Sequence, residues 1–324
     1  MKAIVCTQYG PPNLLEYKEI AAPECRDNEI IVNVKYCSVN FPDTLIIQGK
    51  YQFRPEPPFV PGSDFSGIIS RVGNKVSEYK IGDEVIGMAK YGGFAKEIAV
   101  APALLTRKPK EMSFKEASCF LYTYSTAYYA LKHRAHIKSG HKVVILGASG
   151  GVGLAAVELA KYFDAIVIAA ASTEEKLEIC KQYGADHIIN YSKEDLKIRI
   201  KELTNGQGAD IILDPIGASY SEAALRAIAW EGHYLVVGFA AGEIPRVPLN
   251  LVLLKGCQIT GVFLGSFAMR FPGKLETMRN ELLSMYSSGN LKPHIQKVMP
   301  LDKTPEAIQM MVDRKAIGKL VIKI

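Results

Sequence analysis

Three glycines, Gly147, Gly150 and Gly153, follow a strongly apolar run and open a helical pattern in the sequence VVILGASGGVGLAAVELAKYF. A glycine turn of this kind lets the backbone approach a pyrophosphate, whose negative charge meets the N–H groups at the start of the helix. The same spacing also occurs in tight strand–helix turns that bind no ligand. A second apolar run, AIVIAAA, follows within the roughly thirty residues that a mononucleotide-binding unit requires. We therefore predict a dinucleotide site here.

The end of the second apolar run bears on which dinucleotide would bind. In sites for NAD, an acidic side chain near this point accepts a hydrogen bond from the ribose 2′-hydroxyl. This sequence has Ala171 and Ser172 there instead, with Lys176 one helical turn later. An acid would repel a 2′-phosphate, whereas Ser172 can hydrogen-bond to it and Lys176 can pair with it. The pattern predicts NADPH, with the alternative that Lys176 is an ordinary solvated helix residue.

Two secondary-structure patterns divide the 324 residues. The N-terminal third is rich in Pro, Gly and alternating strand patterns such as EIIVNVKYCSV, which predicts a small β-barrel. From Ser113 onwards, where Ser113 and Glu116 match a capping box, strand and helix patterns alternate. This alternation predicts an α/β domain with a doubly wound parallel sheet. The last strand pattern, KLVIKI, has no place in that sheet, so we expect it to return to the β-rich domain.

The composition is that of an ordinary globular protein, with 48% hydrophobic residues, 22% charged residues and a formal net charge of +6. The basic residues are scattered, so nucleic acid is not expected as a partner. None of the six cysteines is in CxxC spacing, which favours free thiols in a reducing compartment. The sequence has neither a signal-peptide pattern nor an apolar run of membrane-spanning length. We expect a cytoplasmic protein without membrane contact.

The glycine-rich segment is one of several motifs that follow each other along the whole chain. The others include VNFPDTLIIQGKY, PGSDFSGIISRVG, IGDEVIG, YGGFAKE, KQYGADHIINY and GKLVIKI. In this order the set resembles the zinc-independent medium-chain dehydrogenases/reductases, in the NADPH:quinone oxidoreductase group. The resemblance implies a GroES-like β-barrel domain formed by residues 1–120 and 265–324, with an inserted Rossmann domain of residues 121–264. It also implies a homodimer, because the family commonly pairs the edges of its Rossmann sheets.

The zinc-dependent branch of this family has two cysteines and a histidine as the ligands of its catalytic zinc. The matching positions in this chain carry Asn40, Ser63 and Tyr122. None of these side chains is a good zinc ligand. The cysteine-rich structural zinc lobe of that branch is also missing, and the six histidines do not form a replacement site. The sequence predicts no metal.

The resemblance also implies the contacts of the cofactor. Asn40 and Thr126 match residues beside the nicotinamide, with an Asx-turn as the alternative role of Asn40. Ser172, Lys176 and Tyr191 match a clamp for the 2′-phosphate. The matched positions of the pyrophosphate loop are Gly147, Ser149, Gly150, Gly151, Val152 and Gly153. The two residues whose backbone would hold the carboxamide are Phe239 and Phe263, and the basic residue near the pyrophosphate is Lys319. Core packing is the alternative for the two phenylalanines.

Without a metal to polarise a carbonyl, hydride requires an acceptor that is already electrophilic. We predict NADPH-dependent hydride transfer to a quinone or a similar conjugated carbonyl, a small-molecule substrate. Asn40, Asp43 and Tyr51 are the candidate catalytic residues, expected to contact the substrate rather than to act as required general acids. Two alternatives stay open. One is an enoyl-thioester or 2-alkenal reductase, which shares all of these motifs, and the other is a nucleotide-binding protein with a secondary RNA-binding or structural role.

Overall fold

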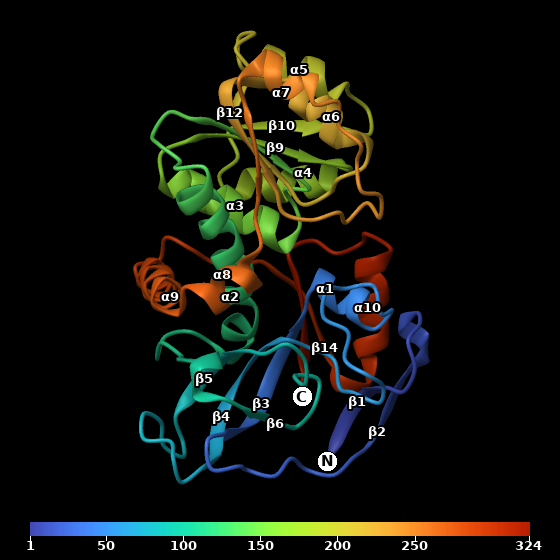
Figure 1. Ribbon diagram of the computed structural model, residues 1–324, viewed down its shortest axis with the longest axis vertical. Helices are drawn as coiled ribbons and strands as arrows, with labels where there is room; N and C mark the ends of the chain where they lie inside the picture. The colour runs from blue at the N-terminus through green and yellow to red at the C-terminus, as the bar shows by residue number, and fades with distance from the viewer. The chain divides into compact units, whose positions relative to one another are not determined.

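The computed structural model describes all 324 residues, and the chain forms two compact units. Unit 1 consists of Met1–Tyr122 and Pro293–Ile324, and unit 2 of Thr123–Lys292 (Figure 1). The chain passes from one unit to the other twice, first within helix α2 (Phe114–Tyr128) and again after Lys292. Both termini therefore belong to unit 1.

The domain boundaries predicted from the sequence stay a prediction, and the compact units differ from them by two residues at 121–122 and by the segment 265–292. Residues 265–292 were expected in the barrel domain, whereas they belong to unit 2. The segment is helical, and its two helices, α8 (Leu264–Arg270) and α9 (Pro272–Ser287), contact each other. Tyr128 and Lys132 of unit 2 both hydrogen-bond to Glu281 on α9, which joins the segment to that unit.

Unit 1 is built on a seven-stranded sheet in the order β14-β15-β3-β4-β5-β7, with β6 paired to β3. The last strand of the chain pairs antiparallel with β3, with Leu320 opposite Val39, which confirms the expected return of KLVIKI. The strands are β3 (Ile30–Val39), β4 (Asp64–Val72), β5 (Glu84–Met88), β6 (Glu97–Val100), β7 (Leu105–Arg107), β14 (Ile295–Pro300) and β15 (Lys319–Lys323), beside the separate pair β1 (Lys2–Cys6) and β2 (Leu15–Glu19).

The helices of unit 1 are short and flank this sheet. They are α1 (Phe41–Ile46), α10 (Thr304–Val312), and the single 3₁₀ turns η1 (Pro12–Leu14), η2 (Pro102–Leu104) and η4 (Leu301–Lys303). Helix α1 begins directly after β3, and α10 lies beside it (Figure 1). The core beneath them is formed by alternating strand residues such as Ile30, Val32 and Val34 of β3. Helix α1 begins at the capping box formed by Asn40 and Asp43.

Unit 2 contains a six-stranded sheet in the order β10-β9-β8-β11-β12-β13, in which every pair of neighbours is parallel. Helices cover both of its faces (Figure 1), which confirms the doubly wound sheet predicted from the alternating pattern. The strands are β8 (Lys142–Leu146), β9 (Ile166–Ala171), β10 (His187–Asn190), β11 (Ala209–Asp214), β12 (Ile228–Val236) and β13 (Gln258–Gly261). The continuous burial of β8 and β9 is typical of strands covered on both faces.

The helices of unit 2 connect consecutive strands of the sheet. Besides α8, α9 and the second half of α2, they are the π-helical turn η3 (Tyr129–Arg134), α3 (Gly151–Tyr162), α4 (Glu174–Gln182), α5 (Leu196–Leu203), α6 (Ser219–Arg226) and α7 (Asn250–Lys255). None of the helices in the structure combines the length and the apolar character that a membrane span requires. The cytoplasmic location stays a prediction.

Close packing in unit 1 depends on a glycine in a strand. A Cβ atom at Gly87 of β5 would lie 2.1 Å from the tip of the Phe65 ring, which is fully buried. Phe65 lies opposite Gly87 in the paired strands β4 and β5, and its ring is part of the core of unit 1. A side chain at position 87 would have to displace this buried ring.

We expect Gly87→Ala to lower the free energy of unfolding by about 1–3 kcal/mol, the usual range for overpacking a core. Urea denaturation followed by circular dichroism measures this. The matched control is Gly273→Ala in the first turn of α9, where a Cβ atom meets nothing within 4 Å, and we expect it to leave stability unchanged or slightly raised. Equal stability of the two variants would contradict the packing argument.

Candidate functional site

The predicted pyrophosphate loop forms a tight turn between β8 and α3. Gly147 has a φ of +57°, a conformation that favours glycine. A Cβ atom at Gly153 would lie 2.4 Å from the Gly147 carbonyl oxygen, so the helix can approach the turn this closely only with glycine there. Gly150 precedes the first residue of α3, and no side chain caps this end of the helix. The N-terminus of α3 therefore offers backbone N–H groups that an anion can bind.

Ser172 and Lys176 meet at the end of the next strand. Ser172 follows β9 directly, and Lys176 lies in the first turn of α4, whose N-cap Thr173 accepts a hydrogen bond from the Lys176 backbone N–H. Lys176 Nζ lies 3.4 Å from Ser172 Oγ. A hydroxyl and an ammonium group are thus presented together at the carboxyl end of β9. The carboxyl end of β8 lies beside it in the parallel sheet, as expected for a dinucleotide site.

Tyr191 completes this edge of the sheet. It follows β10, and its backbone N–H donates to the carbonyl of Ala171, which places it next to the start of the Ser172 segment. Its ring packs against Tyr220 at a centroid distance of 4.6 Å. The three residues predicted as a 2′-phosphate clamp are therefore close together in unit 2.

One acidic residue near this clamp was missed by sequence reasoning. Glu174 opens α4 only two residues after Ser172. Its Oε1 accepts hydrogen bonds from Asn190 Nδ2 at 2.8 Å and from Lys193 Nζ at 3.1 Å, and these bonds lower the pKa of the carboxyl group. The charge of Glu174 thus has partners of its own. Its position directly after the second apolar run is the signal that could have identified it.

The other predicted residues of unit 2 lie on α2 and after the strands. Thr126 is a buried residue of α2. Phe239 follows β12 and is half-buried, and Phe263 follows β13 and is 47% exposed, so Phe263 is not a core residue. Ser149 in the glycine turn is buried. Because β12 and β13 are parallel neighbours, the two phenylalanines follow the same edge of the sheet.

In unit 1, Asn40 is held between β3 and α1 by several hydrogen bonds. Its backbone N–H donates to Asp43 Oδ2 at 2.8 Å, which closes the first turn of α1. Its side-chain Oδ1 accepts a hydrogen bond of 2.6 Å from Lys319 Nζ. Its Nδ2 faces Ser38, with distances of 3.5 Å to the carbonyl oxygen and 3.4 Å to Oγ. Lys319 is also buried, and it donates to the carbonyl of Val39 at 3.1 Å.

Two buried carboxyl groups accompany this cluster. Asp43 and Asp64 have no solvent exposure, and Asp64 Oδ2 accepts a hydrogen bond from Ser38 Oγ at 3.1 Å. Burial raises the pKa of each to about 7, although the nearby ammonium of Lys319 favours the ionised form. Asp64 was not identified from the sequence. The signal was present, because a charged residue directly opens the apolar strand β4.

Tyr51 lies beside Tyr122, one of the positions that match a zinc ligand. The two side chains are hydrogen-bonded to each other. Burial raises the pKa of Tyr51 and holds that of Tyr122 well above its ordinary value, and the charge of Asp43 acts on both in the same direction. The structure therefore brings all three candidate catalytic residues, Asn40, Asp43 and Tyr51, into one region of unit 1.

Comparison with known proteins assigns the chain to a family. The "Quinone oxidoreductase-like protein 2 homolog" of Nematostella vectensis is 38% identical over 323 residues, which cover 99% of this chain and 88% of the relative. The chain belongs to the quinone oxidoreductase group of the medium-chain dehydrogenases/reductases. A family model described as "Alcohol dehydrogenase GroES-like domain" matches residues 26–110, and one described as "Zinc-binding dehydrogenase" matches residues 151–280. The predicted family and fold class are thereby confirmed.

Solved structures of this family are similar over the full length. The quinone oxidoreductase of Escherichia coli, solved in complex with NADPH, has a TM-score of 0.95 at 28% identity and matches 100% of both chains. An enoyl reductase, CurK, has a TM-score of 0.89 at 28% identity, with 99% of this chain and 98% of that chain covered. Reductases named for two different acceptors thus share the architecture of this family member.

Because one family model is described as zinc-binding, we considered whether the residues at the matching positions fit zinc. Asn40, Ser63 and Tyr122 supply neither a thiolate nor an imidazole. In addition, Oδ1 of Asn40 already accepts a hydrogen bond from the Lys319 ammonium, so a dication bound there would face a buried positive charge. Zinc therefore does not fit these residues.

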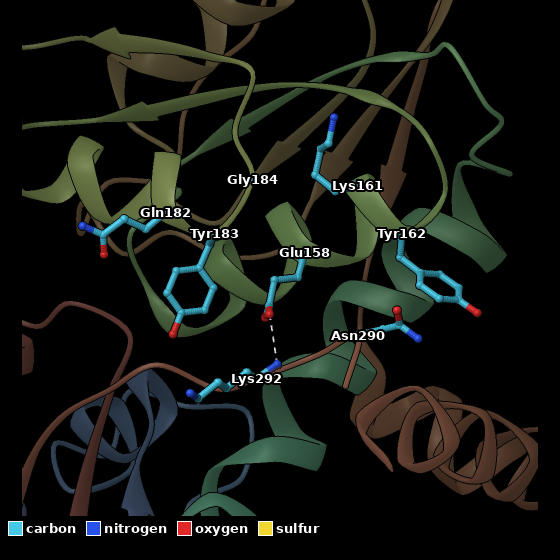
Figure 2. Close-up of a pocket in the computed structure, with 8 residues that line it drawn as sticks. All are labelled: Glu158, Lys161, Tyr162, Gln182, Tyr183, Gly184, Asn290 and Lys292. Carbon is cyan, nitrogen blue, oxygen red and sulfur yellow. Dashed lines mark hydrogen bonds between the residues drawn. The ribbon is translucent and has the colours of Figure 1, made fainter. Parts of the chain in front are cut away.

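A separate pocket of about 550 Å³ lies on unit 2 (Figure 2). Glu158 of α3 is at its centre and accepts a hydrogen bond from the Lys292 backbone N–H at 2.9 Å. Burial raises the pKa of Glu158 to about 7. Glu158 lies eight residues beyond Gly150, about 12 Å along the helix. The pocket contains none of the residues predicted from the sequence.

We expect Asp64→Asn to gain stability relative to the wild type as the pH rises from 5 to 8. The folded-state pKa of Asp64, about 7, lies above the unfolded value of about 3.9, so the folded protein binds more protons within this window and loses stability as they dissociate. The variant lacks this titration. Between pH 5 and pH 8, the free energy of unfolding of the variant should rise by at least about 1.4 kcal/mol relative to that of the wild type, which corresponds to one pKa unit.

Urea denaturation at the two pH values measures this difference. The control is Asp27→Asn, since Asp27 is exposed and paired only with Lys75, and its stability relative to the wild type should not change with pH. A difference between Asp64→Asn and the wild type that stays constant from pH 5 to pH 8 would show that the carboxyl group of Asp64 does not titrate in this range.

Proposed function

We propose that this chain is an NADPH-dependent oxidoreductase that transfers hydride to a quinone or a similar conjugated carbonyl compound without a metal. The observation that carries the proposal is the placement of Ser172 and Lys176, 3.4 Å apart, at the sheet edge next to the uncapped N-terminus of α3. A pyrophosphate and a 2′-phosphate require these two kinds of anion site side by side. The NADPH complex of the Escherichia coli relative supports the choice of cofactor.

The residues of this chain would divide the binding of NADPH, which supplies the hydride. The N–H groups of the turn from Gly147 to Gly153 would bind the pyrophosphate, and Ser172, Lys176 and Tyr191 the 2′-phosphate. Thr126 and Asn40 would contact the nicotinamide side, together with the backbone at Phe239 and Phe263. A cradle of this kind needs no protein cap at α3, which agrees with the absence of a capping side chain.

Hydrogen-bond donors of unit 1 can stabilise the negative charge that forms on the acceptor oxygen. A tyrosine hydroxyl can both donate and accept, so the hydrogen-bonded pair Tyr51 and Tyr122 can also donate a hydrogen bond to a substrate oxygen. An isolated carbonyl would need a Lewis acid to polarise it. A quinone or enone instead spreads the negative charge that hydride transfer creates over its conjugated system. The high pKa of Tyr51 argues against its acting as a strong acid, so its proposed role is hydrogen bonding and orientation.

A second candidate function is reduction of the carbon–carbon double bond in an enone, a 2-alkenal or an enoyl thioester. The similarity to the CurK enoyl reductase favours it. The same donors would then stabilise an enolate instead of a reduced quinone. The two functions differ in the acceptor alone, and a panel of acceptors distinguishes them.

Purified protein should oxidise NADPH with small quinones or conjugated enones, and it should show negligible turnover with acetaldehyde. The reason is that no Lewis acid polarises a simple carbonyl. The rate with each acceptor is measured as the loss of the near-ultraviolet absorbance that NADPH has and NADP⁺ lacks. A chelator should leave the rates unchanged. Brisk reduction of acetaldehyde with the quinones and enones inert, or activity lost together with a removed metal, would overturn the proposal.

Lys176→Ala should weaken NADPH binding at least about tenfold and leave NADH binding nearly unchanged, since a charge-assisted contact contributes about 1.5–3 kcal/mol. Fluorescence titration of both cofactors measures the two affinities. Lys181→Ala is the control, because Lys181 lies on the same helix and is paired with Glu178 at its surface. Equal losses for NADPH and NADH would mean that Lys176 acts through the fold of α4.

We further propose that the protein is a homodimer joined at the edge strand β13. Ile259 of β13 is 42% exposed, and the neighbouring Trp230, Leu253 and Leu254 expose between 67% and 79% of their surface. The Trp230 ring lies against Gly256 in the turn before β13, which places it beside the start of the edge strand. An open apolar edge of this kind requires a covering partner.

Sedimentation should give a dimer for the wild type at micromolar concentration, and Ile259→Lys should shift it towards the monomer, because a charge at an edge strand opposes pairing. Ile81→Lys is the control, since Ile81 is 67% exposed and belongs to unit 1, which contributes nothing to β13. A wild type that sediments as a monomer would remove the basis for this assembly.

A further inference from the structure

Lys319 is a buried lysine at the start of β15. It retains 3% of its surface, whereas Lys323 at the other end of the same strand is exposed. Lysine is almost never buried to this degree without partners, because the ammonium loses its hydration. The partners of Lys319 therefore indicate what the buried charge does.

Both hydrogen bonds of Lys319 go to the junction of β3 and α1. Its Nζ donates to the carbonyl of Val39 at 3.1 Å and to Asn40 Oδ1 at 2.6 Å. An ammonium group can only donate hydrogen bonds. It is therefore compatible with only one orientation of the Asn40 carboxamide, the one in which the oxygen faces Lys319. The flipped orientation would place the Asn40 NH₂ group against the ammonium. Lys319 thus decides which end of this side chain is the acceptor.

The two aspartates hold the rest of Asn40 in the same frame. Asp43 accepts the backbone N–H of Asn40, and Asp64 accepts the hydroxyl of Ser38, towards which Asn40 Nδ2 points. Both carboxyl groups lie near enough to Lys319 for its charge to act on them. Asn40 is therefore restrained at its backbone and at both ends of its carboxamide.

We propose that Lys319 is a positioning residue for Asn40 and not itself a contact of the cofactor. Its buried ammonium fixes the Asn40 carboxamide with Oδ1 as the group turned to β15, and Asn40 meets the nicotinamide side of the cofactor in that orientation. The inference rests on the proposed function in one respect, since Asn40 is taken to contact the cofactor. It replaces the role near the pyrophosphate that the family resemblance implies for Lys319.

A double-mutant cycle on NADPH affinity tests this proposal without any acceptor. The variants are Lys319→Met, Asn40→Ala and the double variant, and their dissociation constants are measured by fluorescence titration at low and high salt. We expect each single variant to weaken binding several-fold, and the double variant to be no weaker than the weaker single one. Lys323→Met on the same strand is the matched control and should bind NADPH as the wild type does.

Three outcomes would overturn the proposal. The losses of the two single variants could multiply in the double variant, which would mean that Lys319 acts independently of Asn40. The loss from Lys319→Met could shrink markedly at high salt, as expected for a direct contact with a phosphate. Finally, Asn40→Ala could bind NADPH normally, and Lys319 would then have no contact to position.

The unliganded protein provides a second readout. Urea denaturation of the same four proteins should show coupling between positions 319 and 40, because the interaction exists before any cofactor binds. If Lys319→Met does not fold, the variant that combines Lys319→Met with Asp64→Asn replaces it in the cycle, because this variant removes one buried charge of each sign. Asp64→Asn alone is then the reference protein.

Lys319→Arg keeps the positive charge and the hydrogen-bond donors, so its NADPH affinity should lie between those of Lys319→Met and the wild type. Independent unfolding effects at the two positions would contradict the proposal.

This design separates the inference from the proposed function. Should the wild type oxidise NADPH with none of the acceptors, the proposed function fails, while the binding and unfolding cycles still report on Lys319. Should the wild type reduce quinones and the cycle be additive, the positioning role fails and the proposed function stands.

Discussion

The antiparallel pairing of β15 with β3 is the interaction on which the site in unit 1 depends. It brings Lys319 against Asn40 across 279 residues of sequence, and it does so in a fixed register, with Leu320 opposite Val39. A shift of one residue would turn Lys319 to the other face of the sheet. The hydrogen bonds of Lys319 to Val39 and Asn40 and the placement of its charge near Asp43 and Asp64 follow from this register.

Unit 2 obeys a simpler constraint, the common direction of its strands. Because β8, β9 and β10 are parallel neighbours, their carboxyl ends meet at one edge, and the glycine turn, Ser172 and Tyr191 follow these ends in order. No single long-range contact is needed to assemble them. The cofactor residues of unit 2 are therefore placed by topology, whereas Asn40 is placed by a specific buried charge.

This difference explains what could be predicted from the sequence. The parallel sheet, the glycine turn and the pairing of Ser172 with Lys176 depend on residues close together in the chain, and local patterns predict them. The contact between Lys319 and Asn40 depends on strand register between distant segments, which no local pattern encodes. The charge at the start of the apolar strand β4 was a signal for Asp64, but its partners Ser38 and Lys319 are distant in the chain, so no local motif shows its role. The segment 265–292 was assigned by family resemblance, and its packing partners, such as Glu281, are also distant in sequence.

The position of β15 has a consequence for the order in which the protein forms during synthesis. All of unit 2 lies between the two segments of unit 1, so the ribosome completes residues 123–292 before it makes β15. Unit 2 contains every strand of its own sheet and can fold while the chain is still growing. Unit 1 must wait with an unpaired edge on β3, and with Asp43 and Asp64 lacking their buried cation. The segment that closes the β-sheet and places a cation in its interior is thus made only after the whole of unit 2.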